Sequence, residues 1–301
     1  MGLKTEIAGI KMKNPVMVAS GTFGYGEEPS KYVDLNQLGA IITKTVTLEP
    51  REGNPPPRIC ETSSGMLNSI GLQNKGISDF VNLALPFLAK FKTPVIVNIA
   101  GDSPEQYAKL AKILSREPIV KGLELNISCP NVKKGGLQFG TDHDATSNLV
   151  KTVRKATNLP LIVKLSPNVT DITVIAKAAA KAGADAISLI NTFLGMSIDA
   201  ETKHFNLGAK TGGLSGPAIK PVAVRMVWQT AQVVKIPVIG VGGIMNGNDA
   251  IEFFLAGASA IEVGTANFID PQAPLKIVKE IEEYLKKHNL SHYKALIGKV
   301  N

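Results

Sequence analysis

Short runs of apolar, often β-branched residues recur along the chain, separated by segments in which apolar positions repeat every three to four residues. The short runs predict strands, and their apolar character throughout indicates burial on both faces. Such burial is typical of parallel sheets that are covered by helices. The eight runs are Val16–Ser20, Ala40–Thr47, Val95–Ala100, Gly122–Ser128, Leu161–Ser166, Ala186–Thr192, Val238–Gly243 and Ala260–Thr265.

The segments with helical periodicity follow individual strand runs. They include Ser103–Arg116, Thr146–Thr157, Thr170–Ala182 and Pro217–Val234. Eight strand–helix units in 301 residues predict a (β/α)8 barrel, an α/β fold, as a single domain over residues 1–301. A doubly wound open sheet is the structural alternative, but the number of units and the lack of a topological break favour a closed barrel.

The connections between these elements differ in length. Those after helices are short, as at Asn158–Pro160, whereas three connections after strands are long: Leu48–Asn74, Pro130–His143 and Phe193–Gly216. In a barrel, all connections after strands lie on one rim, and long loops inside a compact domain are usually functional. We therefore expect this rim to be the active face.

Composition and charge exclude several classes of protein. With 44% hydrophobic and 19% charged residues, the chain has the composition of a globular protein with a large core. It contains neither an apolar run of membrane-spanning length nor the apolar core of a signal peptide. Two cysteines provide no disulfide framework and no metal-site spacing, and the net charge of +8 is scattered. We expect a cytoplasmic protein without a metal site or a nucleic-acid or membrane partner.

One of the two cysteines occupies a notable position. Cys129 ends a strand-like run and is followed by Pro130, which stops the strand, and by a loop containing Gly135 and Gly136. Taken alone, a single cysteine is more often a small buried hydrophobic residue. The end of a barrel strand is, however, where catalytic groups collect, so Cys129 is a candidate catalytic residue.

Glycines end the last two strand runs, in Gly242-Gly243 and Gly264-Thr265. Loops after the seventh and eighth barrel strands commonly bind a phosphate through backbone N–H groups. Because a side chain would hold the phosphate away from these groups, glycine suits such loops. A plain tight turn explains one glycine pair alone, but two pairs at these strands predict a phosphate site, which Gly216 could complete.

Polar residues near the ends of other strands predict the rest of a pocket. Lys44 and Lys164 interrupt apolar runs, either as edge residues that reach solvent or as charges inside a pocket. Four asparagines provide amide groups that both donate and accept hydrogen bonds. They are Asn68, Asn98, Asn126 and Asn191. Together these residues predict a pocket for a polar heterocycle beside a phosphorylated cofactor.

At this level of detail the chain resembles a known family, dihydroorotate dehydrogenase, in the form of its class 1B catalytic subunit. The resemblance covers essentially the whole chain. Its motifs are Ala19–Gly21, Thr43–Thr45, Asn68–Asn74, Asn126–Asn131, Asn191–Thr192 and the two glycine sites. It implies an FMN-containing barrel that oxidises (S)-dihydroorotate to orotate in pyrimidine (UMP) biosynthesis.

The resemblance also implies roles for the matching positions. Cys129 would be the general base, while flavin N5 would accept the hydride. FMN would be held by Ser20, Lys44, Thr45, Asn98, Asn126, Lys164, Ile190, Gly216, Gly242, Gly243, Gly264 and Thr265. Substrate would meet Lys44, Asn68, Ser69, Ile70, Gly71, Leu72, Asn126, Asn191 and Thr192.

The route of the electrons beyond this chain rests on the resemblance alone. The sequence contains no Gly-x-Gly-x-x-Gly dinucleotide motif and no cysteine cluster. Class 1B implies a partner subunit with FAD and a [2Fe-2S] cluster that passes electrons to NAD+, around a homodimer core within a heterotetramer. The membrane-linked class 2 enzymes, which use serine as the base and carry an N-terminal extension, resemble the chain less.

Three alternatives remain at this point. The first is a class 1A-type homodimer that uses fumarate, and the second is a related FMN enzyme that reduces another pyrimidine. The third is a flavin-free aldolase barrel that uses Lys164 as a Schiff-base amine and binds a phosphorylated sugar. This last alternative leaves Cys129 and the asparagines without a role.

Overall fold

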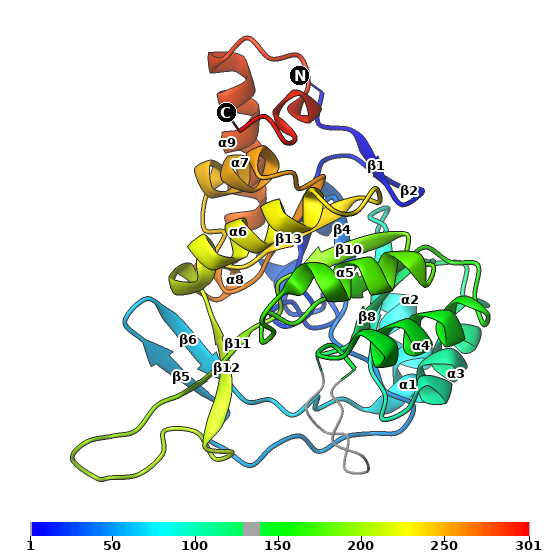
Figure 1. Ribbon diagram of the computed structural model, residues 1–301, viewed down its shortest axis with the longest axis vertical. Helices are drawn as coiled ribbons and strands as arrows, with labels where there is room; N and C mark the ends of the chain where they lie inside the picture. Colours follow the sequence, from blue (N-terminus) through cyan, green and yellow to red (C-terminus); the bar gives the residue numbers. More distant parts are fainter. Residues whose placement is uncertain (1, 129–138, 301) are drawn as a thin grey trace.

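The structure, a computed structural model, describes residues 2–128 and 139–300, and eight parallel strands form a closed barrel in it (Figure 1). Each strand overlaps one of the eight predicted runs, so the (β/α)8 barrel is confirmed. Hydrogen bonds between β14 and β3 close the barrel. The strands are β3 (Val16–Val18), β4 (Ala40–Ile42), β7 (Val95–Ile99), β8 (Val120–Asn126), β9 (Leu161–Lys164), β10 (Ala186–Leu189), β13 (Val238–Val241) and β14 (Ala260–Val263).

Helices surround the barrel and begin at residues suited to that position. The side chain of Asp142 accepts a hydrogen bond from the Ala145 N–H at the start of α4, and Asp171 accepts one from the Thr173 N–H at the start of α5. The helices are α1 (Gly76–Asp79), α2 (Leu85–Leu88), α3 (Pro104–Leu114), α4 (His143–Arg154), α5 (Ile172–Lys181), α6 (Lys220–Ala231), α7 (Gly247–Leu255), α8 (Ala266–Ile269) and α9 (Ala273–Lys287). A π-helical turn, η3 (Phe80–Ala84), joins α1 to α2.

The crossover from β3 to β4 departs from the strand–helix alternation. Among the described residues it contains only two 3-10 turns, η1 (Pro29–Lys31) and η2 (Leu35–Gln37). Gly24 and Gly26 have positive φ angles of 56° and 86°, which an α-helix does not accommodate. The glycines therefore explain why this unit lacks a regular helix.

Two long connections carry strands that the hydrophobic pattern does not predict. β5 (Ile59–Thr62) and β6 (Gly65–Asn68) come from the first, and β11 (Phe193–Met196) and β12 (Thr211–Ser215) from the other. They pair as a four-stranded antiparallel sheet in the order β11-β12-β6-β5, which projects from the barrel at the lower left of Figure 1. We call this sheet the arm. Its strands are rich in glycine, a residue that usually weakens strands, so tertiary pairing overrides local preference here.

The opposite end of the barrel is closed by a hairpin of β1 (Thr5–Ile7) and β2 (Ile10–Met12). Its apolar side chains join the lower layer of the barrel interior. That layer contains Met17, Ala40, Ile42, Ile96, Ile162, Ala186, Ile239 and Ala260. Among the described residues, no helix combines the length and apolar character needed to cross a membrane.

The barrel interior becomes polar toward the other end. Side chains two positions apart share one face of a strand, so the residues that follow the apolar layer also point inward. They include the buried side chains of Asn98, Glu124, Lys164, Ser188 and Glu262. The polar layer therefore forms the floor beneath the rim on which the long connections lie.

Candidate active site

Three glycine-containing loops meet at the end of β13 and β14. Gly216, Gly242 and Gly243 have φ angles of 97°, 126° and 73°, which a side chain would strain. A Cβ atom at Gly243 would lie 2.9 Å from the carbonyl oxygen of Gly216. In addition, Thr265 Oγ1 donates a hydrogen bond to Ser215 Oγ at 2.9 Å. The predicted phosphate residues are thus adjacent although they come from three separate segments.

These loops offer backbone donors. The N–H groups of Gly243, Ile244 and Thr265 donate hydrogen bonds to no described residue. The nearby Lys220 ammonium is instead occupied by Asp249 Oδ1 at 2.6 Å and Glu252 Oε1 at 2.9 Å. Unpaired N–H groups in glycine-rich loops bind anions well. The geometry therefore favours recognition of an anion by the backbone.

Asp249 fixes the loop that follows β13. Its Oδ2 accepts a hydrogen bond from the Met245 N–H at 2.9 Å, while its Oδ1 binds Lys220. Although burial alone would lower the pKa of Lys220, hydrogen bonds to the two carboxylates raise it. Lys220 lies on α6, so this ion pair ties the start of that helix to the glycine loop.

Side chains at or just beyond the ends of β4, β7, β8 and β10 form the polar wall of the site. Thr45 Oγ1 donates to Asn98 Oδ1 at 2.6 Å, and both residues are buried. Asn191 Nδ2 donates to Asn126 Oδ1 at 3.2 Å. Four of the predicted residues therefore come together as two hydrogen-bonded pairs.

Lys44 lies two residues after the end of β4 and is half-buried. Burial, and next the positive charge of Arg58, lower its pKa below the ordinary value. Arg58 is held by two carbonyl oxygens, those of Asn54 at 2.6 Å and Glu52 at 3.0 Å. Two neighbouring cations make this side of the rim suited to a carboxylate. The sequence analysis did not identify Arg58, because no local pattern distinguishes it from a surface arginine.

The predicted substrate segment 68–72 lies at the base of the arm. Asn68 Nδ2 donates to the Gly213 carbonyl at 3.2 Å. Gly213 packs so tightly on Thr192 that a Cβ atom there would lie 2.0 Å from Thr192 Oγ1. Asn68 and Thr192 thus approach β12 from two different insertions. The two groups of predicted substrate residues therefore converge.

Asn54 holds the turn that follows Asn68. Its Nδ2 donates to Ser69 Oγ at 2.7 Å, and its backbone N–H donates to the Ile70 carbonyl at 3.0 Å. The turn continues through Gly71 and Leu72, whose φ angles are 71° and 56°. The predicted substrate segment is therefore a constrained turn and not an open loop.

The remaining predicted residues have simple placements. Ser20 is buried two residues after the end of β3, and Gly264 directly follows β14. Ile190 is buried after β10, within 3.4 Å of where a Cβ atom on Gly242 would be. Cys129 lies outside the described residues, so its catalytic role stays a prediction.

The sequence analysis missed an ionic cluster in the barrel floor. Lys164 Nζ donates to Glu262 Oε2 at 2.9 Å and lies 4.0 Å from Glu124 Oε1. Ser188 Oγ donates to Glu124 Oε2 at 2.9 Å, and Asn98 Nδ2 donates to Glu124 Oε1 at 2.5 Å. Both glutamates are fully buried. Each interrupts an apolar strand run, which is the signal that could have identified them.

The charged groups within this cluster shift one another's pKa values. Burial would lower the pKa of Lys164, but the fields of Glu124 and Glu262 raise it, so Lys164 is a cation. Burial, followed by the charge of Glu124, raises the pKa of Glu262 well above its ordinary value despite Lys164. Lys164, which the sequence predicts as a charge inside a pocket, is thus a member of a buried ionic cluster.

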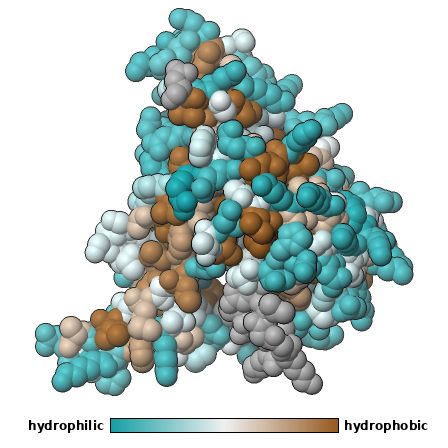
Figure 2. All heavy atoms as spheres, in the orientation of Figure 1, coloured by the Kyte–Doolittle hydropathy of each residue, from teal (hydrophilic) through white to brown (hydrophobic). Residues whose placement is uncertain are grey.

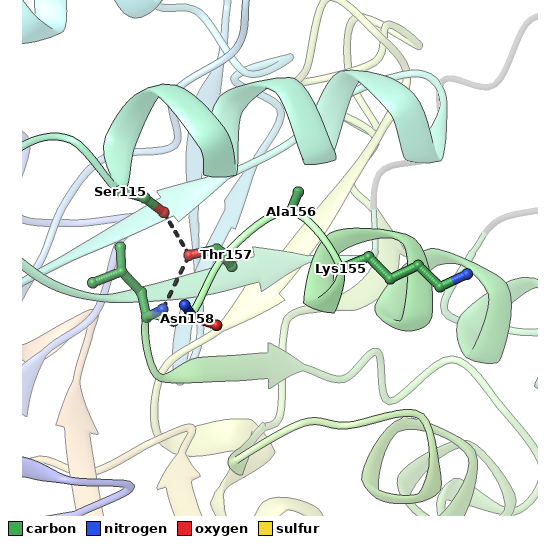
Figure 3. Close-up of a pocket in the computed structure, with 6 residues that line it drawn as sticks. Ser115, Lys155, Ala156, Thr157 and Asn158 are labelled. Carbon is green, nitrogen blue, oxygen red and sulfur yellow. Dashed lines mark hydrogen bonds between the residues drawn. The ribbon is translucent and has the colours of Figure 1, made fainter.

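A separate hollow lies at the other end of the barrel, where α4 leads into β9 (Figure 3). Ser115 Oγ and Thr157 Oγ1 share a hydrogen bond of 2.5 Å there, and Lys155 extends away from this pair. Thr157 Oγ1 also accepts a hydrogen bond from the Leu159 N–H at 3.0 Å. These contacts fasten a helix–strand connection, so the hollow is structural.

Comparison with known proteins identifies the family to which the chain belongs. The sequence model of the family described as dihydroorotate dehydrogenase matches residues 2–285. A protein of Geotalea daltonii named dihydroorotate dehydrogenase B (NAD(+)), catalytic subunit, is 59% identical over 98% of this chain and 97% of its own length. Proteins of the same name from Geobacter metallireducens and Geobacter sulfurreducens are each 60% identical over the same shares. The chain belongs to the dihydroorotate dehydrogenase family.

Proposed function

We propose that this chain is the FMN-dependent catalytic subunit of an NAD+-linked dihydroorotate dehydrogenase, which oxidises (S)-dihydroorotate to orotate in pyrimidine (UMP) biosynthesis. One observation carries the proposal: backbone donors suited to a phosphate and a cationic side suited to a carboxylate occupy the same barrel rim. The names of relatives about 60% identical to this chain support the choice of substrate and acceptor.

The residues present fit FMN. The unpaired N–H groups of the glycine loops would hold its phosphate, in a cradle that a Cβ atom at Gly243 would distort. The polar wall and floor would contact the rest of the cofactor through Ser20, Lys44, Thr45, Asn98, Asn126, Lys164 and Ile190. When bound, FMN supplies a two-electron acceptor, which none of the protein side chains provides.

The side chains around the substrate would bind and orient it. Lys44, close to the positive Arg58, would pair with the carboxylate. Amide groups of Asn126 and Asn191, which already contact each other, would hold the polar ring together with Thr192 and the Asn68–Leu72 turn. A fixed orientation of the substrate lowers the barrier to reaction.

Cys129 would remove the proton that lies beside a ring carbonyl, while a hydride leaves the neighbouring carbon. An ordinary thiol has a pKa of about 8.5, so a small local shift gives a usable thiolate near neutral pH. Tyr107 donates to the Asn126 carbonyl at 2.7 Å, two residues before the last described residue of this connection. This contact would help to hold the strand end from which Cys129 extends.

The electrons would leave through a partner subunit that carries FAD and a [2Fe-2S] cluster, with a homodimer of this chain as the core of a heterotetramer. The arm and the segment 197–210 that joins β11 to β12 support an assembly of this kind, because they expose large apolar side chains (Figure 2). They are Ile59, Leu194, Met196, Ile198 and Phe205.

The aldolase alternative fits the structure poorly. A Schiff-base lysine must lose its proton to act as a nucleophile, whereas the two carboxyl groups raise the pKa of Lys164. Among the described residues, the buried Glu124 and Glu262 serve to keep this amine charged. The observation favours a role for Lys164 as a fixed cation.

An anaerobic visible spectrum of the purified chain, recorded before and after addition of dihydroorotate, tests the proposal. A flavin spectrum that bleaches on addition supports both the cofactor and the substrate. A flavin that stays oxidised contradicts the substrate, and a protein that remains colourless after reconstitution with FMN contradicts the cofactor. Efficient reduction of fumarate by a homodimer would move the chain to class 1A.

A further inference from the structure

The barrel floor contains more acidic than basic side chains. Within the eight barrel strands, the buried charged side chains are Glu124, Lys164 and Glu262, which we call the triad. With both carboxyl groups ionised, the triad would carry a net negative charge at a buried position. Such an unbalanced buried charge is costly, and a carboxyl group in this position usually takes up a proton.

The two carboxyl groups have different surroundings. Both oxygens of Glu124 accept hydrogen bonds, one from Asn98 and one from Ser188, as expected of an ionised group. Glu262 accepts from Lys164 through Oε2, while its Oε1 is buried and has no partner among the described residues. The two carboxyl groups meet at the same ammonium, since Lys164 Nζ lies 2.9 Å from Glu262 Oε2 and 4.0 Å from Glu124 Oε1. A hydrogen bond with Glu124 is also among the causes that raise the pKa of Glu262. A proton on Glu262 would therefore both neutralise it and provide a donor toward Glu124.

We propose that Glu262 is a positioning residue that carries a proton shared with Glu124, which makes the triad neutral overall and holds the Lys164 ammonium at the floor of the site. The direction of the pKa shift at Glu262, raised by burial and by Glu124, agrees with this assignment. The shared proton satisfies the Oε1 atom that otherwise has no partner. Lys164 then faces one carboxylate and one neutral acid.

The other groups facing the triad cannot supply this proton. β3, β4, β7, β10 and β13 contribute no titratable side chain, and on β8 the only other one is Lys121, which is exposed. Asn98 and Ser188 donate hydrogen bonds without changing charge. Lys44 lies beyond the end of β4 and is half-buried. Protonation of the floor is thus decided within the triad.

The consequence for the cofactor rests on the proposed function. A neutral triad would present the Lys164 cation to the proposed cofactor site without an excess of negative charge, whereas loss of the shared proton would leave a net negative floor. A negative floor would oppose the negative charge that a flavin gains on reduction. Glu262 would in this way influence the redox potential of the flavin without touching the substrate.

The first test needs neither a flavin reaction nor a substrate. Infrared spectra of the full chain at neutral pH should show a carboxylic-acid C=O band in the wild type that disappears in Glu262→Gln. Asp249→Asn, which removes a carboxylate paired with Lys220, is the control and should keep the band. A wild type without the band, or a Glu262→Gln variant that retains it, would overturn the proposal even if the dehydrogenase function is correct.

The second test uses the pH dependence of unfolding. The folded chain holds one proton more than the unfolded chain between the ordinary pKa of a glutamate and the raised pKa of Glu262. The folding equilibrium constant should therefore fall about tenfold per pH unit in this window, relative to Glu262→Gln. Equal slopes for the two proteins would contradict the shared proton.

The third test asks whether the effects of two substitutions on FMN affinity add up in the double variant. Glu124→Gln and Glu262→Gln each leave one carboxyl group, which can ionise opposite Lys164, so each should change FMN affinity by no more than about threefold. The double variant leaves Lys164 without an anionic partner and should weaken FMN binding by at least about thirtyfold. Additive effects would contradict the proposal. If no variant binds FMN, the proposed cofactor fails while the infrared result for the triad still stands.

Discussion

The two ends of the site differ in the chemical groups that they present: backbone N–H groups at one end and polar side chains at the other. The glycine loops after β12, β13 and β14 present backbone N–H groups, and there is little space for a side chain at Gly216, Gly242 and Gly243. The floor and wall consist of side chains whose charges and hydrogen bonds depend on one another, as in the triad. The first end would recognise a ligand by shape, because backbone donors are fixed once the loops are folded. The second end works by charge compensation, so its behaviour depends on protonation.

The largest expected effect belongs to neither end. Cys129→Ala should retain FMN and lower the rate of flavin reduction by dihydroorotate about a hundredfold to ten-thousandfold, because it would remove the proposed general base. Stopped-flow absorbance under anaerobic conditions measures this rate, and the FMN content of the purified variant is the control. A variant that is reduced at nearly the normal rate would remove Cys129 from the mechanism and leave the chemistry to the wall residues.

The next largest effect tests recognition by shape. Gly243→Ala would place a Cβ atom 2.7 Å from Lys220 Cβ and 2.9 Å from the Gly216 carbonyl, at a φ of 73°. It should weaken FMN binding at least about tenfold through strain and displaced N–H groups. Fluorescence titration of the chain with FMN measures the affinity.

Gly264→Ala is the matched control for protein packing. A Cβ atom at Gly264 would have its nearest neighbour at 3.7 Å, an ordinary contact. The thermal stability of this variant in the absence of FMN should therefore stay close to that of the wild type, whereas Gly243→Ala should be less stable. Equal stability of the two variants would show that the glycine loops adapt more freely than their geometry indicates.

The third prediction tests charge compensation at the rim. Because burial and Arg58 lower the pKa of Lys44, this side chain should lose its proton at a lower pH than an ordinary lysine. Orotate binding should therefore weaken as the pH rises through that lowered pKa. We call this loss of orotate affinity at high pH the alkaline limb. Arg58→Gln should move it to higher pH, since the substitution removes a positive charge near Lys44.

Orotate affinity measured across alkaline pH provides the readout, and Arg51→Gln is the control. Arg51 pairs with Asp102 at 2.7 Å and is not among the causes of the Lys44 shift. It should leave the limb in place. If Arg58→Gln also leaves it in place, the field of Arg58 does not act on Lys44 in the bound state.

The same contrast explains which features could be predicted from sequence. The glycine pairs and the strand runs are local patterns with a direct physical meaning, so the barrel and the phosphate-type loops followed from them. The triad depends on side chains from β8, β9 and β14 that meet only when the barrel closes. Lys164 was therefore predicted, while Glu124 and Glu262 were overlooked as members of apolar runs.

The arm shows a second reason why part of the structure could not be predicted from the sequence. Its strands carry glycines at positions 195, 212 and 213, which favour loops in isolation. Gly213 is required because it packs against Thr192 while its carbonyl oxygen accepts the hydrogen bond from Asn68. Pairing between two insertions that are far apart in sequence creates this sheet, and no local pattern records it. The substrate residues were predicted from motifs, but the sheet that holds them was not.

The smallest expected effect is a difference in stability between losing a buried hydrogen bond of the polar wall and losing a partly exposed ion pair. Thr45→Val removes the hydroxyl that donates to Asn98 Oδ1 at 2.6 Å and leaves that buried oxygen unpaired, so it should cost about 1–3 kcal/mol of stability. Breaking the partly exposed Arg51–Asp102 pair with Asp102→Asn should cost only about 0–1 kcal/mol. Denaturant unfolding of the two variants measures both values. Equal losses would mean that the wall tolerates an unpaired amide oxygen, and the argument that its hydrogen bonds fix the site would then fail at Asn98.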